Sequence, residues 1–271
     1  MQYSRTSIAG AAVGFFFILA AIIIGTRDIG GFFSLEGLMI VIGGTLAVAF
    51  MSFEANYVVE ALRSIGLMFR RAETTHNNLQ KDLIEIIAWA RIVKERGLMG
   101  LENETGRKGI ADPFVKYGID MVVSNYSPEE VRTMMETAAD AAFERSTVPV
   151  RVLTAMASHA PAFGMVGTLV GMVIMLADLG GDMSGIGAGL AISLLATLYG
   201  VVTARMIYMP AAAKLLQKEE ELRFRNQLIT EGLALLVANK SPRYIQDRLN
   251  SFLRFESHYD IDGLAYKEIT L

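Results

Sequence analysis

Four stretches of this chain are apolar and contain no Asp, Glu, Lys or Arg: residues 8–25, 37–53, 152–177 and 183–204. A helix needs roughly 20 apolar residues to cross the hydrocarbon core of a bilayer, which is about 30 Å thick. Each stretch is close to that length or above it. A short turn separates the first two stretches, and another separates the last two. The pattern therefore predicts four transmembrane helices in two hairpins.

The composition supports a membrane protein and excludes several functions. Hydrophobic residues make up 52% of the 271 residues and charged residues only 20%, which is too apolar for a soluble chain of this size. A net charge of −3 without a basic run does not suit a nucleic-acid partner. The chain has no cysteine, and His76, His159 and His258 are scattered, so we expect no disulfide and no metal site.

The distribution of charge predicts the orientation. Lys and Arg are abundant between the two hairpins and after the second, whereas the turns at 26–33 and 178–185 hold only Arg27. Because Lys and Arg concentrate in cytoplasmic loops, both termini are expected in the cytoplasm. A cleaved signal peptide is the alternative for residues 8–25, but this apolar run is longer than a signal core.

These features predict an all-α membrane protein with four segments. The expected domains are a transmembrane hairpin at 1–54, a cytoplasmic helical domain at 55–150, a second transmembrane hairpin at 151–210 and a cytoplasmic helical tail at 211–271.

Helix signals continue through the polar regions. Apolar residues recur at helical spacing around Val58 and Leu83, without the alternation of a strand. Ser127-Pro128 and Ser241-Pro242 each place a capping serine before a proline, which is typical of a helix N-terminus. The charged residues at 215–225 are expected to continue the fourth membrane helix, mostly as a solvated surface.

An ionisable group inside a membrane is costly and is usually retained for function. The apolar stretches contain no carboxylate at mid-depth, and Arg205 lies where its long side chain can reach the cytoplasm. The nearest acidic residues, Asp28, Glu36, Asp178 and Asp182, fall at the outer ends. If this protein moves ions, a partner must supply the central carboxylate.

Motifs in the second half of the chain resemble a known family. Residues 160–171 (APAFGMVGTLVG), residues 194–200 (LLATLYG), Pro210 and residues 241–249 (SPRYIQDRL) are similar to the MotA/PomA stator family. That family belongs to the MotA/TolQ/ExbB proton channel superfamily. The resemblance covers nearly the whole chain and includes the order of two helices, a cytoplasmic domain, two helices and a tail.

The resemblance implies a multi-pass protein of the bacterial inner membrane that serves motility. Copies of the chain would form a homo-oligomeric ring in the lipid, expected to be a pentamer. The ring would surround a dimer of a MotB/PomB-type single-helix partner, whose membrane Asp binds the permeating ion. Ion flow would turn the flagellar rotor through its protein FliG.

The resemblance also implies the ion pathway, which would include Pro161, Thr168, Thr197 and Pro210. A proline inside a helix removes one hydrogen bond and frees a carbonyl, and a threonine hydroxyl can coordinate an ion. Ordinary kinks and helix-to-helix hydrogen bonds are the alternative roles. Sodium-driven relatives place a threonine where this chain has Ala196, which favours protons and leaves sodium as the alternative.

A rotor contact is implied in the cytoplasmic domain. Lys94 and Glu102 match the spacing of the basic and acidic residues through which the family contacts FliG, and Arg91 and Arg96 could share that role. The alternative is a solvated helix surface with an Arg91/Glu95 pair at i, i+4.

Three other functions are alternatives to this one. An energiser of the ExbB/TolQ type would have one helix before its cytoplasmic domain, whereas this chain has two. A self-contained transporter would need its own buried ionisable site and often shows inverted repeats. No nucleophile and base pair or phosphate loop indicates an enzyme, so we expect neither enzyme activity nor a cofactor.

Overall fold

A computed structural model of the chain describes residues 5–25, 30–67, 75–178 and 183–261. All regular structure in these ranges is helical, which confirms the all-α prediction. Asp28 and Asp182, which the sequence places at the outer turns, lie outside the described residues.

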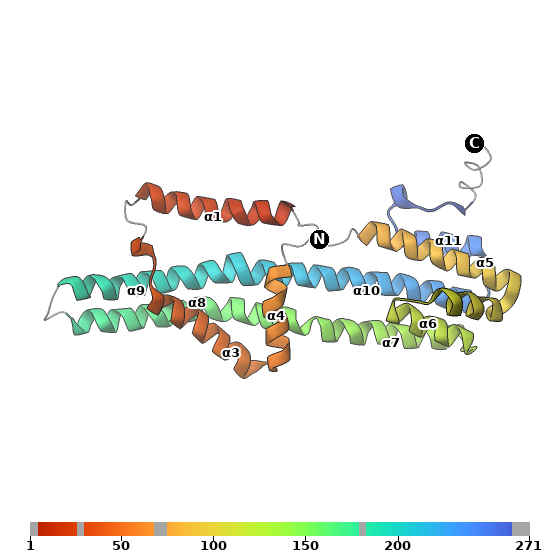
Figure 1. Cartoon of the computed structure of the whole chain (residues 1–271), viewed down its shortest axis with the longest axis horizontal. Coiled ribbons are helices and arrows are strands. Elements are labelled where there is room, and N and C mark those ends of the chain that lie inside the picture. The colour runs from red at the N-terminus through yellow and green to blue at the C-terminus, as the bar shows by residue number, and fades with distance from the viewer. Residues whose placement is uncertain (1–4, 26–29, 68–74, 179–182, 262–271) are drawn as a thin grey trace. The chain divides into compact units, whose positions relative to one another are not determined.

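The helices belong to two compact units (Figure 1). The first unit comes from residues 1–71 and 146–218, and the second from residues 72–145 and 219–271. The first holds α1 (Arg5–Gly25), η1 (Gly30–Phe32), α2 (Leu35–Leu38), the π-helix η2 (Met39–Gly43), α3 (Gly44–Ser52), α4 (Ala55–Leu67), α8 (Val148–Ala177), α9 (Met183–Val202) and the π-helix η3 (Thr203–Tyr208). The second holds α5 (Thr75–Lys108), α6 (Pro113–Val123), α7 (Pro128–Ser146), α11 (Pro242–Asn250) and η4 (Phe255–Ser257), while α10 (Met209–Val237) crosses the boundary.

Three helical stretches in the described chain are long and apolar enough to cross a membrane. They are Gly30–Ser52, Pro128–Ala177 and Gly185–Val237. The remaining predicted span, residues 8–25, lies within α1. Large apolar side chains of α1 are exposed within the chain, including Phe16 at 65% and Ile24 at 86%.

The hairpin of α8 and α9 is packed backbone to backbone (Figure 1). A Cβ added at Gly189 would lie 2.6 Å from the backbone nitrogen of Met175 and 2.8 Å from the carbonyl oxygen of Gly171. A Cβ at Gly200 would lie 2.6 Å from the carbonyl oxygen of Ala160. Without apolar burial against water as a driving force, membrane helices associate through such close approaches of small residues.

The second unit is built around one apolar core. Its fully buried members include Leu83 and Ile86 of α5, Met135 of α7, Leu233 of α10 and Ile245 of α11. Each of these helices turns one apolar face inward, as helical spacing in the sequence predicts.

Both serine-proline helix starts are confirmed. The Ser127 backbone N–H donates to Oε2 of Glu130 at 2.8 Å, and the Glu130 N–H donates back to Oγ of Ser127 at 3.3 Å, which is a complete capping box. Oγ of Ser241 accepts the N–H of Tyr244 at 3.2 Å at the start of α11. These local signals are independent of tertiary packing, so the sequence predicts them well.

The helix α5 is broken at Gly97. This residue has φ 67° and ψ −173°, a backbone conformation that is essentially restricted to glycine. The chain then re-enters the core at Leu101, which is fully buried. The regular helix expected around Leu83 therefore ends before Glu102, and Lys94 and Glu102 lie on different helical segments.

Gly97→Ala is expected to destabilise the second unit by about 1–3 kcal/mol, the usual cost of forcing a residue with a Cβ into this region of φ/ψ space. Gly106→Ala, also in α5, is the matched control, because nothing lies within 4 Å of an added Cβ at either glycine and only Gly97 has a positive φ. Thermal unfolding in detergent measures both. Equal melting temperatures for the two variants would mean that the break at Gly97 does not exist.

Within the second unit, ion pairs join α10 to α5 and to the start of α6. Arg225 donates from Nε to Oδ2 of Asp82 at 2.6 Å and from Nη2 to Oδ1 of Asp82 at 2.8 Å, and its Nη1 lies 2.5 Å from Oδ2 of Asp112. Asp112 also caps α6 by accepting the N–H groups of Phe114 and Val115. Partial burial opposes ionisation of Asp112, but the Arg225 and backbone hydrogen bonds outweigh it and lower the pKa of this carboxyl.

Candidate functional site

A cluster of oxygen atoms joins α8 to α9 in the otherwise apolar hairpin. Oγ1 of Thr168 lies 2.6 Å from Oγ1 of Thr197, and it can also donate to the carbonyl oxygens of Ser193 at 3.0 Å or Gly164 at 3.2 Å. Oγ1 of Thr197 lies 3.4 Å from the carbonyl oxygen of Gly164 and 3.5 Å from that of Ser193. The two predicted threonines are therefore in direct contact.

The cluster can pass a proton or contribute ligands to a cation. Each hydroxyl carries one hydrogen and two lone pairs, so the Thr168–Thr197 pair can reverse its direction of donation without moving heavy atoms. Thr197 is exposed and Thr168 is half-buried within the chain. The oxygens therefore lie at the edge of the hairpin, where a group from another chain can approach.

Ser193 completes the cluster, although the sequence did not single it out. Its hydroxyl donates to the carbonyl oxygen of Thr168 or of Gly189, each at 3.0 Å, and its side chain is buried. Gly189, Ser193 and Thr197 are spaced four residues apart on one face of α9. A small and polar stripe at that spacing is the signal that could have identified Ser193.

Ala196 points away from the open edge of the cluster. It is fully buried, and a Cβ built on Gly167 would meet the Cβ of Ala196. A hydroxyl at position 196 would consequently start between α8 and α9 rather than at the exposed edge beside Thr197.

The two predicted prolines have different surroundings. Pro161 is half-buried inside α8, and its Cα lies 3.2 Å from the position of an added Cβ on Gly200 of α9. Lacking an N–H, Pro161 leaves the carbonyl of Ala157 without its helical donor. Pro210 is exposed at the start of α10, directly after the π-turns of η3, so it lies at an irregular helix segment.

The start of α2 is fixed against α9 by Tyr199. The hydroxyl of Tyr199 accepts the N–H of Ser34 at 2.9 Å and donates to the carbonyl oxygen of Phe32 at 2.7 Å. Oγ of Ser34 donates to Oε2 of Glu36 at 3.0 Å. Glu36, predicted at an outer end of the membrane, is the second residue of α2, and α2 starts beside Tyr199 in the C-terminal half of α9 rather than beside Met183.

The predicted rotor residues all lie on α5. Lys94, Glu102, Arg91 and Arg96 are exposed, with Arg91, Lys94 and Arg96 before the break at Gly97 and Glu102 after it. None of these four residues is buried in the core of the second unit.

Comparison with known proteins identifies the family. The chain is 33% identical over 247 residues to motility protein A of Borreliella burgdorferi, covering 91% of this chain and 93% of the relative. It is 31% identical over 250 residues to the chemotaxis protein PomA of Vibrio alginolyticus, covering 91% and 94%. The chain belongs to the MotA/PomA family.

Two further comparisons agree with this assignment. The model of the MotA/TolQ/ExbB proton channel family matches residues 107–228 of this MotA/PomA-family chain. Its fold is similar to that of a chain in the MotAB structure from C. jejuni, with a TM-score of 0.81 and 23% identity, covering 92% of this chain and 96% of that chain. The resemblance found in residues 160–171 and 194–200 is thereby confirmed.

Proposed function

We propose that this chain is the ring-forming subunit of an ion-driven stator that turns the flagellar rotor. The main support is the oxygen cluster of Thr168, Thr197 and the Gly164 and Ser193 carbonyls. It lies at the open edge of a hairpin whose apolar stretches, 152–177 and 183–204, contain no carboxylate. Such a cluster can relay or coordinate an ion, but it cannot hold one without a counter-charge.

A MotB/PomB-type partner supplies that counter-charge. Its membrane Asp would lie against the edge formed by Thr168 and Thr197. Protonation or ion binding at that Asp neutralises its charge, which lowers the cost of moving it across the apolar faces of α8 and α9. Repeated transfers from one subunit to the next advance a homo-oligomeric ring, proposed to be a pentamer, around the partner dimer.

Protons are the proposed ion. The Thr168 and Thr197 hydroxyls offer a short proton relay, whereas a sodium ion needs several oxygen ligands to replace its hydration shell. Because Ala196 is buried, a hydroxyl at that position would not point to the open edge of the cluster. The preference for protons over sodium therefore depends on the small number of oxygens at that edge. A steep dependence of motor speed on external sodium at fixed proton-motive force would overturn it.

From the distribution of Lys and Arg, Lys94 and both termini are proposed to lie in the cytoplasm. The protein would be an inner-membrane protein with four spans, in which α1 is the first span. The boundaries at 1–54, 55–150, 151–210 and 211–271 are proposed with it. Because the chain has no natural cysteine, single cysteines at Phe33 and Lys94 can be labelled in intact cells. Labelling of position 94 by an impermeant reagent would contradict this topology.

The rotor contact is proposed to lie on the exposed charges of α5, with FliG as the partner. Lys94→Glu and Glu102→Lys are expected to lower torque, and more strongly together, because surface charges act mainly on recognition. Stability should change by no more than about 0.5 kcal/mol. Tethered-cell rotation measures the torque, and Lys116→Glu, an exposed lysine of α6, is the control. Unchanged torque in the double variant would show that these residues form an ordinary solvated surface and do not contact the rotor.

Complementation tests the proposed function directly. The chain, co-expressed with a single-helix partner that has a membrane Asp, is expected to restore swimming to a motile bacterium lacking its own stator genes. Replacing the partner Asp by Asn should abolish the effect. Swimming that persists after that replacement would contradict the mechanism.

A further inference from the structure

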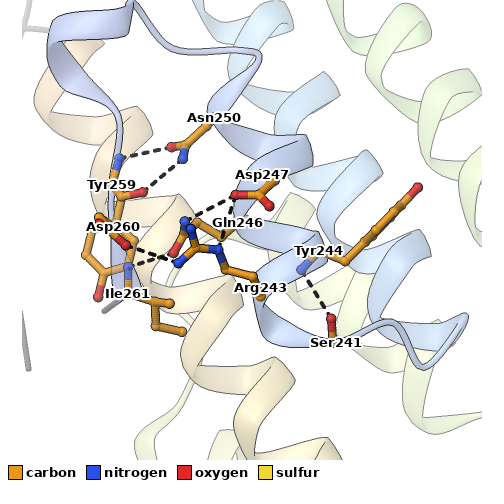
Figure 2. A network of polar contacts seen from close by, with 9 residues as sticks. All are labelled: Ser241, Arg243, Tyr244, Gln246, Asp247, Asn250, Tyr259, Asp260 and Ile261. Atoms are coloured by element: carbon orange, nitrogen blue, oxygen red, sulfur yellow. Dashed lines mark hydrogen bonds and ion pairs between the residues drawn. The ribbon is translucent and has the colours of Figure 1, made fainter. Parts of the chain in front are cut away.

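The C-terminal segment of the described chain is held against the second unit through its backbone. Residues 257–261, here called the strap, begin at the last residue of η4 and lie beside α11 (Figure 2). The side chain of Asn250 donates from Nδ2 to the carbonyl oxygen of Tyr259 and accepts the Tyr259 N–H, both at 2.9 Å. Oε1 of Gln246 accepts the N–H of Ile261 at 2.7 Å. The side-chain amides of Asn250 and Gln246 therefore make the hydrogen bonds to the strap backbone that a neighbouring strand would otherwise make.

The spacing of these bonds explains why a helix can present them. Gln246 and Asn250 are four residues apart on α11, which is about 6 Å along a helix. Their partners Ile261 and Tyr259 are two residues apart, which is about 6.8 Å along extended chain. The two repeats nearly coincide, so one helix face can bind alternate residues of an extended segment that runs antiparallel to it.

A third bond comes from another helix. Nε2 of Gln80 on α5 donates to the carbonyl oxygen of Ser257 at 2.8 Å, so the strap is bonded to both α5 and α11. The bonded residues 257, 259 and 261 alternate along the chain, with Ser257 at the end of η4 and no regular structure at 258–260. The receiving site is thus formed by Gln80, Gln246 and Asn250.

Side chains of the strap add selectivity to this backbone recognition. Tyr259 and Ile261 pack against the apolar core of the second unit, whereas the intervening Asp260 is exposed and pairs with Arg243 at 3.2 Å (Figure 2). Pockets for alternate side chains combined with main-chain hydrogen bonds are the features of strand-type peptide recognition.

Gln246 and Asn250 are also unusual for a helix face packed on a core. Their side chains are only 2% and 7% exposed, and the bonds of Asn250 go to the strap. Burial of a carboxamide is tolerated only when its hydrogen bonds are made. If the strap leaves, water can replace it at both carboxamides, which makes release reversible.

We propose that the face of α11 and α5 lined by Gln80, Gln246 and Asn250 is a binding site for an extended peptide of the type Tyr-Asp-Ile, occupied by the strap of the same chain and open to exchange. The site recognises backbone N–H and C=O groups at alternate residues. Its selectivity comes from one aromatic and one aliphatic side chain separated by an outward acidic residue.

Hydrogen exchange of single amides in the full chain tests the assignment of the bonds. In the unaltered protein, the amides of Tyr259 and Ile261 should exchange slowly and that of Asp260 quickly. Asn250→Ala should speed exchange at Tyr259 by about tenfold or more. Asn250→Asp keeps the acceptor oxygen and should retain protection there. Asn103→Ala, the same change at an exposed position of α5, is the control.

Competition by a free peptide tests whether the site exchanges its occupant. The peptide FESHYDI, which copies residues 255–261, is added to the full chain in detergent. A short tether such as residues 251–256 gives the strap an effective concentration in the millimolar range, so half-displacement is expected at about 1–10 mM peptide. Displacement would raise the exchange rates of the chain's own Tyr259 and Ile261 amides, while FESHADA, which lacks both anchoring side chains, should have no effect.

Three outcomes would overturn the proposal. Fast exchange at Tyr259 and Ile261 in the unaltered chain would mean that the strap is not bound. Unchanged exchange at about 10 mM FESHYDI would mean that the segment is permanently packed and that no exchangeable site exists. Equal effects of FESHYDI and FESHADA would remove the selectivity. Protection of amides in α6 reports that each variant is folded, so a failure to fold is recognised separately.

Discussion

Gly189→Ala is expected to abolish stator function by forcing α8 away from α9. The three nearest atoms to an added Cβ at this position are all backbone atoms, at 2.6 to 2.9 Å, and backbone cannot move aside as a side chain can. Over-packing of a close contact costs about 1–3 kcal/mol. The separation would also stretch the 3.0 Å bonds that join Ser193 to the backbone of Thr168 and Thr168 to the backbone of Ser193.

Gly187→Ala provides the control, because it is the same change two residues earlier in α9. Nothing lies within 4 Å of an added Cβ at Gly187. Swimming and thermal stability in detergent should be close to those of the unaltered chain for Gly187→Ala and strongly reduced for Gly189→Ala. If both variants swim and unfold alike, the close approach of α8 and α9 is absent from the working protein.

Thr168→Val is expected to slow ion-driven rotation about tenfold or more while leaving the hairpin assembled. Valine keeps the shape of threonine but removes the hydroxyl that bridges Thr197 and the Gly164 and Ser193 carbonyls. An interhelical hydrogen bond in a membrane contributes only about 0.6 kcal/mol on average, so the loss of stability is small. A step that uses the hydroxyl in its transition state slows about tenfold for each 1.4 kcal/mol lost.

Thr154→Val is the matched control for this substitution. Thr154 lies on the same helix, and its hydroxyl donates to the carbonyl oxygen of Val150 at 2.9 Å within α8. Motor speed near zero load should fall about tenfold or more for Thr168→Val and stay unchanged for Thr154→Val, while Thr168→Ser retains speed. Normal speed in Thr168→Val would assign Thr168 to helix packing alone.

Sequence patterns predicted the parts of this fold that depend on local signals. The starts of α7 and α11 follow from one serine, one proline and, for α7, a glutamate three residues on. The apolar stretches at 152–177 and 183–204 became α8 and α9 because a long run without charge has few other structures available.

Features that depend on how helices meet could not be read from one sequence. The contact between Thr168 and Thr197 requires the register of α8 against α9, which is set by several glycines acting together. Tyr199 reaches the start of α2 across the fold, so no local pattern indicates that bond. The break at Gly97 is hidden because one glycine in a helical pattern is more often tolerated than not.

The charged part of α10 is exposed at Lys218 and Glu220, as expected, but it is not only a solvated surface. Glu219 is buried, and Arg223 pairs with Asp140 at 2.9 Å and lies 4.8 Å above the ring of Phe143. Farther along, Glu231 contacts both Arg132 at 2.9 Å and Arg248 at 2.8 Å. The sequence shows the charges, but only the fold shows that α10 uses them to bind α7 and α11.

Ion flux in liposomes tests the central claim most directly. The purified chain is compared with its complex with a partner that has a membrane Asp, using a pH-sensitive dye under an imposed membrane potential. Because residues 152–177 and 183–204 contain no carboxylate, the account predicts flux from the complex, none from the chain alone, and none after replacement of the partner Asp by Asn. Flux from the chain alone that is lost in Glu36→Gln would contradict it, since the chain would then supply its own carboxylate.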